Sequence, residues 1–198
     1  MKNLITTFFL FLGIVALSQE KTFDTVSQQL KNVSKIDNSD KKVANLLQRF
    51  YNEALQSDKG ELSNDTPEII NKTFEDNNLK NGHILFVFFM YQDYISKTAA
   101  IGKPTNSKYQ VQVMDFLYKE SKEIWDRVPA IIYIYRYEAL ENDNKIEEST
   151  KMISEGLKEY PDSVPLKVYQ YLKTKDQLLK EDLIKNHANH WMVLQYKL

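Results

Sequence analysis

Residues 129–163, PAIIYIYRYEALENDNKIEESTKMISEGLKEYPDS, decide the fold class of this chain. Within residues 146–160, apolar side chains recur at the spacing that places them on one face of a helix. Residues 130–140 form a separate apolar segment, which is bounded by Pro129 and by the Asn-Asp-Asn cluster at 142–144. Because such residues interrupt regular structure, the stretch predicts two helices joined by a short turn.

The same helical spacing occurs in two segments nearer the N-terminus. Their apolar and small side chains repeat at intervals of three and four residues. They are Val43, Leu46, Leu47, Phe50, Tyr51 and Ala54 in the first segment, and Met114, Leu117, Tyr118, Ser121 and Trp125 in the second. The chain holds only five glycines and five prolines, which are too few turn-formers for an all-β domain. We therefore expect an all-α fold.

Capping residues predict where two of the helices begin. Ser39 and Asp40 precede the helix expected at 43–54, and their side chains can accept backbone N–H groups of its first turn. Residues 65–68, Asp-Thr-Pro-Glu, combine two capping side chains with a proline suited to a first helical turn. They predict a short helix that ends at Phe74.

The run from Ile84 to Tyr91 is apolar without a break, so periodicity alone does not assign it. Its phenylalanines and valine would suit a buried strand. A central helix that continues through Ile95 is the favoured interpretation. Gly102 and its neighbours through residue 106 predict a loop after it.

An internal repeat links two parts of the C-terminal half. Residues 129–135 match residues 165–171 at an offset of 36, each with a proline followed by two tyrosines. The same offset places Leu117 on Ile153. A fixed period of this length is typical of helical-repeat proteins.

Residues 145–163 resemble the second helix and closing turn of a tetratricopeptide repeat. In that family, small residues recur seven apart on this helix and a proline follows the second of them. Ser149, Gly156 and Pro161 stand at these places, and Ile153 stands at the large apolar place between them. Small side chains are needed where neighbouring helices approach closely.

The preceding helix is similar to the first helix of such a repeat only in part. Tyr133 and Leu140 stand at large apolar places, but Arg136 and Tyr137 replace the usual leucine and small residue. The resemblance covers residues 130–175 and extends more weakly over 108–198. It implies a short irregular α-solenoid or helical bundle of antiparallel tetratricopeptide-like hairpins, most repeat-like at 108–198.

First helices of tetratricopeptide repeats line a groove that commonly binds a peptide or protein segment. The resemblance implies that eight residues face this groove: Ile131, Ile134, Glu138, Glu141, Lys167, Gln170, Thr174 and Gln177. Independently of the family, Ile134, Glu138 and Glu141 share one helix face by their spacing. The alternative is that the two glutamates belong to an ordinary solvated surface. Tyr133 and Tyr169 are interpreted as core residues.

Residues 1–18 are typical of a cleaved export signal. Lys2 precedes a short apolar run, which ends in Ala16-Leu17-Ser18 and thus supplies the small side chains that signal peptidase requires. The alternative, an uncleaved anchor, would need about 20 apolar residues. The chain has no cysteine, so neither a disulfide nor a thiol-linked lipid can form. We expect a single domain at 19–198 in the periplasm or in secreted form.

Charge and motifs exclude several kinds of function. The net charge of −1 comes from lysines scattered among acidic residues, whereas nucleic-acid binding requires a concentrated basic face. No nucleophile elbow, phosphate-binding glycine loop or dinucleotide fingerprint occurs. His187 and His190 are three apart, but a zinc site needs a third or fourth ligand. We expect no catalytic residues, no metal and no cofactor.

The leading hypothesis is an exported helical-repeat protein that binds a protein or peptide partner in the cell envelope without catalysis. The alternative is a small hydrolase or small-ligand-binding helical domain with a pocket around the aromatic segment 84–95. A pocket that reaches His83, Tyr91 or Tyr94 would favour the alternative. A filled core there would remove its motivation.

Overall fold

The structure, a computed structural model, describes residues 19–102 and 104–198, so the predicted signal at 1–18 lies outside it. The described part is helical and contains no strand, which confirms the all-α prediction. The helices are α2 (Gln19–Val33), α3 (Lys42–Tyr51), α4 (Thr66–Phe74), α5 (Gly82–Ala100), α6 (Ser107–Trp125), α7 (Ala130–Asn142), α8 (Ile146–Glu159), α9 (Val164–Thr174), α10 (Gln177–His187) and α11 (Trp191–Gln195). A π-helical turn, η2 (Asn52–Gln56), continues α3.

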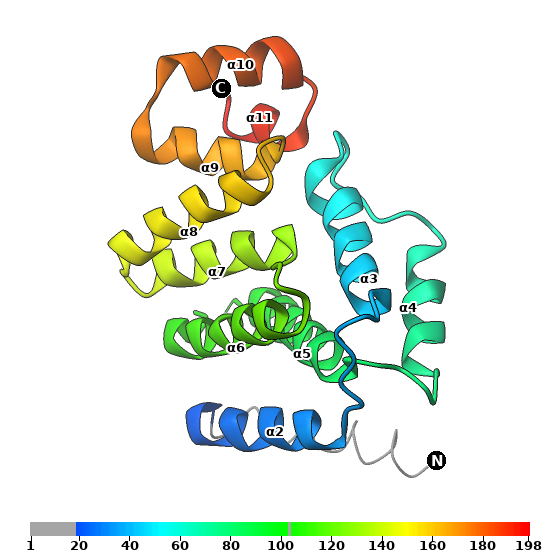
Figure 1. Cartoon of the computed structure of the whole chain (residues 1–198). Coiled ribbons are helices and arrows are strands. Elements are labelled where there is room, and N and C mark those ends of the chain that lie inside the picture. The colour runs from blue at the N-terminus through cyan, green and yellow to red at the C-terminus, as the bar shows by residue number, and fades with distance from the viewer. Residues whose placement is uncertain (1–18, 103) are drawn as a thin grey trace.

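The helices are stacked in chain order along most of the molecule (Figure 1). The helix α2 lies at one end on α5 and α6, the helices α7, α8 and α9 follow, and α10 and α11 lie at the other end. The helix α3 runs along one side of this stack, where it packs against α5 and α7. It therefore covers a face that a simple solenoid would leave open. Among the described residues, no helix is both long and apolar enough to cross a membrane.

The helix predicted at 43–54 forms, but its last turn widens into the π-helical η2. Lys41 is the N-cap residue and makes no side-chain cap bond, but Oδ1 of Asp40 just before it accepts the backbone N–H of Lys42 at 2.7 Å. Ser39 does not cap the helix, because its hydroxyl donates to Asp37 at 2.6 Å. Of the two predicted capping residues, only Asp40 therefore bonds the first turn of α3.

The helix predicted after residue 65 also forms, but the predicted side-chain caps are wrong. Neither Asp65 nor Thr66 bonds the first turn of α4. Asp65 accepts from Arg49 at 2.8 Å, and the fully buried Thr66 donates to Glu53 at 2.6 Å. These contacts to the α3–η2 segment compete for the capping oxygens and tie α4 to it.

The ambiguous apolar run is part of helix α5, as favoured. Ile84, Leu85, Val87 and Phe88 are all 0% exposed, so the first half of α5 is buried on nearly every side, whereas its end at 96–100 is largely exposed. A helix that is apolar all round belongs in the centre of a fold. Because no face of this run is polar, its sequence shows no helical period.

Gly156 is the point of closest approach between α8 and its neighbours. A Cβ atom at this position would lie 2.9 Å from Cδ1 of Leu166 on α9 and 3.2 Å from Cβ of Tyr133 on α7. Ser149 lies two turns earlier on the same face of α8 and is fully buried. Small side chains thus allow α8 to lie tightly between α7 and α9.

The C-terminal helix is fastened to η2. The carbonyl oxygen of Leu55 accepts hydrogen bonds from the rings of His190 at 2.9 Å and Trp191 at 3.3 Å. The ring of Trp191 also lies over Gly60, where a Cβ atom would approach Trp191 Cδ1 to 2.8 Å. Gly60 has a positive φ of 66°, so glycine suits it for two reasons. These contacts place the segment after α11 beside α7 and α9.

Candidate functional site

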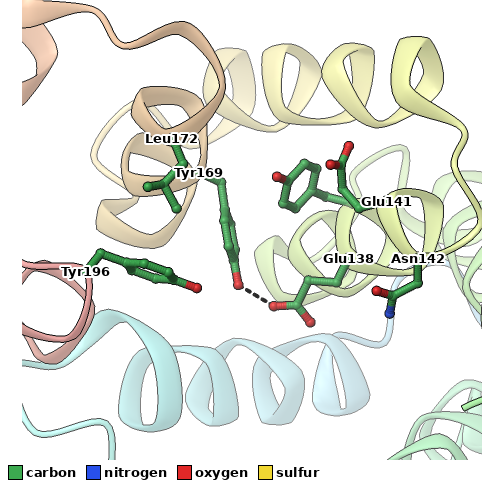
Figure 2. Close-up of a pocket in the computed structure, with 7 residues that line it drawn as sticks. Glu138, Glu141, Asn142, Tyr169, Leu172 and Tyr196 are labelled. Atoms are coloured by element: carbon green, nitrogen blue, oxygen red, sulfur yellow. Dashed lines mark hydrogen bonds between the residues drawn. The ribbon is translucent and has the colours of Figure 1, made fainter. Parts of the chain in front are cut away.

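A pocket of about 380 Å³ opens between α7, α9 and the segment after α11 (Figure 2). Aromatic and acidic side chains dominate its lining. The lining residues are Tyr137, Glu138, Glu141, Asn142, Tyr169, Leu172 and Tyr196. The pocket is within the range of about 300–1,000 Å³ that is usual for small-ligand sites, at its lower end. It can hold one side chain or a small molecule.

Glu138 and Tyr169 line this pocket side by side. The Tyr169 hydroxyl donates a hydrogen bond to Glu138 Oε1 (Figure 2). Burial raises the pKa of the Glu138 carboxyl above its usual range, and the Tyr169 hydrogen bond offsets part of this rise. Among the described residues, no lysine or arginine forms an ion pair with Glu138. The carboxylate is therefore desolvated without a counter-ion.

Tyr169 keeps its proton at any physiological pH. Burial and the neighbouring charge of Glu138 raise the pKa of its hydroxyl far above the usual value. Its ring lies 4.7 Å from that of Tyr137, measured between centroids. Tyr169 thus acts as a fixed donor to Glu138 and as part of an aromatic wall.

Glu141 lies one helical turn beyond Glu138 and differs from it in having a cationic partner. Lys173 Nζ lies 2.6 Å from Glu141 Oε1, and Ser149 also donates to this oxygen. Both partners of the ion pair are mostly buried, at 28% exposure for Glu141 and 20% for Lys173. The pair is close to neutral, so Glu138 is the one carboxyl group of the lining without a cationic partner.

Two of the predicted groove residues, Glu138 and Glu141, line the same open pocket. Neither is an ordinary solvated surface residue, because both are partly buried and bonded to α9 or α8. Their spacing of three on α7 turns both side chains to the same side.

Ile131 and Ile134 do not lie on a groove, which corrects their predicted position. They are 0% and 1% exposed and belong to the main core. The helix α3 packs against α7, so the face expected to be open is covered. Only the C-terminal half of α7 reaches the pocket.

The second predicted row of groove residues is also not assembled as expected. Lys167 lies against α10, where it pairs with Asp182 at 2.8 Å. Gln170 and the exposed Thr174 are on α9 outside the pocket lining. Lys175, with a φ of 56°, ends α9, so Gln177 belongs to the next helix and not to the same face.

The tyrosines divide into core and site residues. Tyr133 is 2% exposed and belongs to the core as predicted, whereas Tyr169 packs on both hydrophobic clusters and also lines the pocket. The sequence interpretation missed Tyr137 and Tyr196 as site residues. A signal existed for Tyr137, because it stands where the resembled family has a small residue.

No protein-family model, curated protein or solved structure matches this chain. The resemblance to tetratricopeptide repeats therefore rests on the sequence motif, and the site must be interpreted from its own geometry.

Of the two histidines considered as metal ligands, His190 is held within the chain by both of its ring nitrogens. His190 is 1% exposed, its Nε2 faces the Leu55 carbonyl at 2.9 Å, and its Nδ1 accepts the Met192 N–H at 3.2 Å. Both ring nitrogens are therefore used within the chain, and the neutral ring fits these contacts. His187 is only partly buried. Within 19–102 and 104–198, no three His, Asp or Glu side chains gather closely enough to hold a metal ion.

The segment proposed for the alternative pocket is filled. Tyr91 is 1% exposed, and His83 is 0% exposed with its Nε2 3.1 Å from Glu120 Oε2. Tyr94 packs edge-on against Tyr109, with ring centroids 4.8 Å apart. These side chains contact one another and their neighbours, so the hypothesis of a pocket at 84–95 loses its motivation.

Replacing Glu138 by glutamine should stabilise the protein at neutral pH by about 1 kcal/mol, because the cost of burying an ionisable carboxyl group without a cationic partner is removed while an acceptor for Tyr169 remains. For a chain of this size, this corresponds to a rise in melting temperature of about 2–4 °C. A raised carboxyl pKa costs stability above the unfolded value of the pKa, so the gain should shrink as the pH falls towards 4.5. Calorimetry of Glu138→Gln beside the exposed control Glu148→Gln tests this. No difference between the two variants would contradict it.

Acidification should destabilise the protein through its two buried histidines. Burial lowers the pKa of both His83 and His190 below 6.5, so the unfolded chain binds protons that the folded chain does not. The stability present above pH 6.5 is then lost as the pH falls from 6.5 through the lower folded values. Urea unfolding between pH 7.5 and 5 measures this in the Glu138→Gln background, which removes the opposing titration of Glu138. A flat profile would show that the histidines are not held neutral.

Proposed function

We propose that this protein binds a protein or peptide partner without catalysis, at the face formed by α7, α9 and the segment after α11. The single observation that carries the proposal is the pocket shared by Glu138, Glu141 and Tyr169. It offers an open cavity with aromatic walls and carboxylates, which is the composition of a recognition site. Tyrosine is also enriched at the energetic centres of protein interfaces.

The helical architecture supports this proposal in a second way. Stacked helices form extended surfaces on which partner segments can lie, as in helical-repeat proteins. We propose, on the sequence motif at 145–163, that this part of the chain is a tetratricopeptide-like repeat. The partner segment would then pass over the C-terminal half of α7, since the residues of α7 that line the pocket all lie there.

We also propose that the protein acts outside the cytoplasm after cleavage of residues 1–18. The support is the sequence of this segment, with its basic start and its Ala16-Leu17-Ser18 end. Mass spectrometry of the protein recovered from its native host should give an N-terminus at Gln19. An intact N-terminus at Met1 in the cytoplasmic fraction would contradict it.

The binding proposal is tested by selecting peptides from a random displayed library on the purified protein. We expect a recurrent sequence motif among the enriched peptides. Binding of these peptides should be weakened about ten-fold or more in the double variant Glu138→Gln/Glu141→Gln, because charged hydrogen-bond acceptors are lost.

The matched control is the double variant Glu147→Gln/Glu148→Gln. It removes the same charge from exposed positions on α8, away from the pocket. Peptides that bind the wild type and this control equally, and the pocket variant less, support the proposed face. Enriched peptides that ignore the pocket variant would place the binding face elsewhere, and failure to enrich any motif would contradict the function.

A further inference from the structure

Most of the side chains that line the pocket are acidic or aromatic. The pocket holds an unpaired carboxylate, a second carboxylate neutralised by Lys173, and rings of three tyrosines. Figure 2 shows the Tyr196 ring reaching towards Tyr169, whose hydroxyl lies at the Glu138 carboxylate. No basic side chain is among the residues that line the pocket. The missing component of this arrangement is a positive charge.

Glu138 provides the reason why a cation would bind here and not merely at any surface carboxylate. A solvated carboxylate loses as much hydration as it gains from a cationic ligand, so exposed pairs contribute little. Glu138 has already lost hydration on folding, as its raised pKa indicates, and one of its oxygens is held in place by Tyr169. A bound cation would therefore offset the free-energy cost of keeping this partly buried carboxyl group ionised.

The tyrosine rings add a second attraction for the same charge. The faces of aromatic rings attract cations, and they also pack against the apolar stem of a long basic side chain. Tyr137 and Tyr169 lie with ring centroids 4.7 Å apart at one wall, and Leu172 adds an apolar contact. Such a lining matches a side chain with an apolar stem and a charged end.

We propose that the pocket binds a cationic side chain, a lysine ammonium or an arginine guanidinium presented by the partner, with Glu138 as its counter-ion. This inference deepens the proposed function and rests on it, since it names the side chain that the partner inserts. The volume of about 380 Å³ suits one such side chain and excludes a folded domain. Glu138 is the single lining carboxyl group without a cationic partner, so one cation would complete the site.

The test uses four small probes, which do not depend on knowing the partner. N-acetyl-lysine methylamide and N-acetyl-arginine methylamide carry the two cations, and N-acetyl-norleucine methylamide is the neutral control with a similar stem. Acetyl-lysine that is also acetylated on its side chain is the neutral control of matched length. Binding is followed by chemical-shift titration of the intact protein.

We expect one or both cationic probes to shift resonances of Tyr137, Tyr169 and Tyr196. Both neutral probes should bind about ten-fold more weakly or not at all, because the ion pair is lost. Glu138→Gln should reduce the affinity for the cations by a similar factor, and Glu148→Gln should leave it unchanged. The stronger of the lysine and arginine probes identifies which cation the pocket prefers.

Equal binding of neutral and cationic probes would overturn the inference, as would full affinity in Glu138→Gln or absence of binding by both cations. These outcomes are separate from failure of the proposed function. Library peptides that need the pocket but carry no basic residue would refute the cation site and leave partner binding intact. Cationic probes that bind while no peptide is enriched would support the cation site and refute peptide binding.

Discussion

Replacing Gly156 by leucine should destabilise the protein by about 3 kcal/mol, the upper end of the usual cost of overfilling a packed core. Even a single Cβ atom would meet Leu166 Cδ1 at 2.9 Å and Tyr133 Cβ at 3.2 Å. Tyr133 and Leu166 are 2% and 0% exposed, so neither has free space to move into. The helices α7 and α9 would have to separate from α8. Urea or thermal unfolding measures the loss.

The matched control is Ser154→Leu, which adds the same side chain to an exposed position of the same helix. It should change the unfolding free energy by less than about 0.5 kcal/mol. Because Gly156 also positions α7 against α9, its replacement should disturb the pocket and lower probe binding. Equal stability of the two leucine variants would mean that the close packing of α8 does not exist in solution.

The helical elements could be predicted from the sequence because their amphipathic periods are local properties. The segments at 43–54 and 114–125 were assigned from spacing alone, and both are helical. The failed cap at Asp65 has a different cause. Its side chain bonds Arg49, sixteen residues away, and no local pattern contains that competing contact.

The site could be predicted only in part, for a related reason. Glu138 and Glu141 were correctly grouped, since one helix face carries both. Ile131 was misplaced, because the assumed groove depends on which helix covers α7, and α3 is far away in the chain. Tyr196 joins the pocket through the docking of α11 on η2, which leaves no trace in the local sequence.

The departure from the family pattern at Tyr137 was the most useful signal that the sequence offered. A small residue there would let the neighbouring helix approach closely, as at Gly156. Tyr137 instead meets the ring of Tyr169. A large side chain at a position of close approach thus coincides with the open pocket, so this departure from the family pattern marks the pocket in the sequence.

Removing the carboxylate of Glu120 should cost about 3 kcal/mol and should loosen the N-terminal helix α2 first. Glu120 is 3% exposed and joins three elements, since its oxygens lie 2.6 Å from Lys31 Nζ on α2 and 3.1 Å from His83 Nε2 on α5. Breaking a buried charged cluster at one member leaves the others without compensation, which usually costs 3–5 kcal/mol. Lys31 is 29% exposed and can turn to solvent, which places the expected cost at the lower end.

In the Glu120→Ala variant, the His83 side chain could not turn to solvent to replace its lost hydrogen bond. Its side chain is 0% exposed, and its Nδ1 already lacks a hydrogen-bond partner among the described residues. The variant would leave both ring nitrogens unpaired in the interior, at a cost that solvent cannot relieve. Glu120→Gln keeps an acceptor oxygen for one partner and should lose less than Glu120→Ala.

Glu123→Ala is the control that separates buried from exposed charge in this cluster. Glu123 approaches the same Lys31 at 3.6 Å, but its side chain is 50% exposed, so its removal should cost less than about 1 kcal/mol. Hydrogen exchange should show loss of protection in α2 for Glu120→Ala, with α7 and α8 least affected, because the main neighbours of α2 within the described part of the chain are α5 and α6. If Glu120→Ala and Glu123→Ala were equally stable, the cluster would add nothing to the docking of α2, and Phe23, 1% exposed between Tyr109 and Phe116, would be what holds that helix.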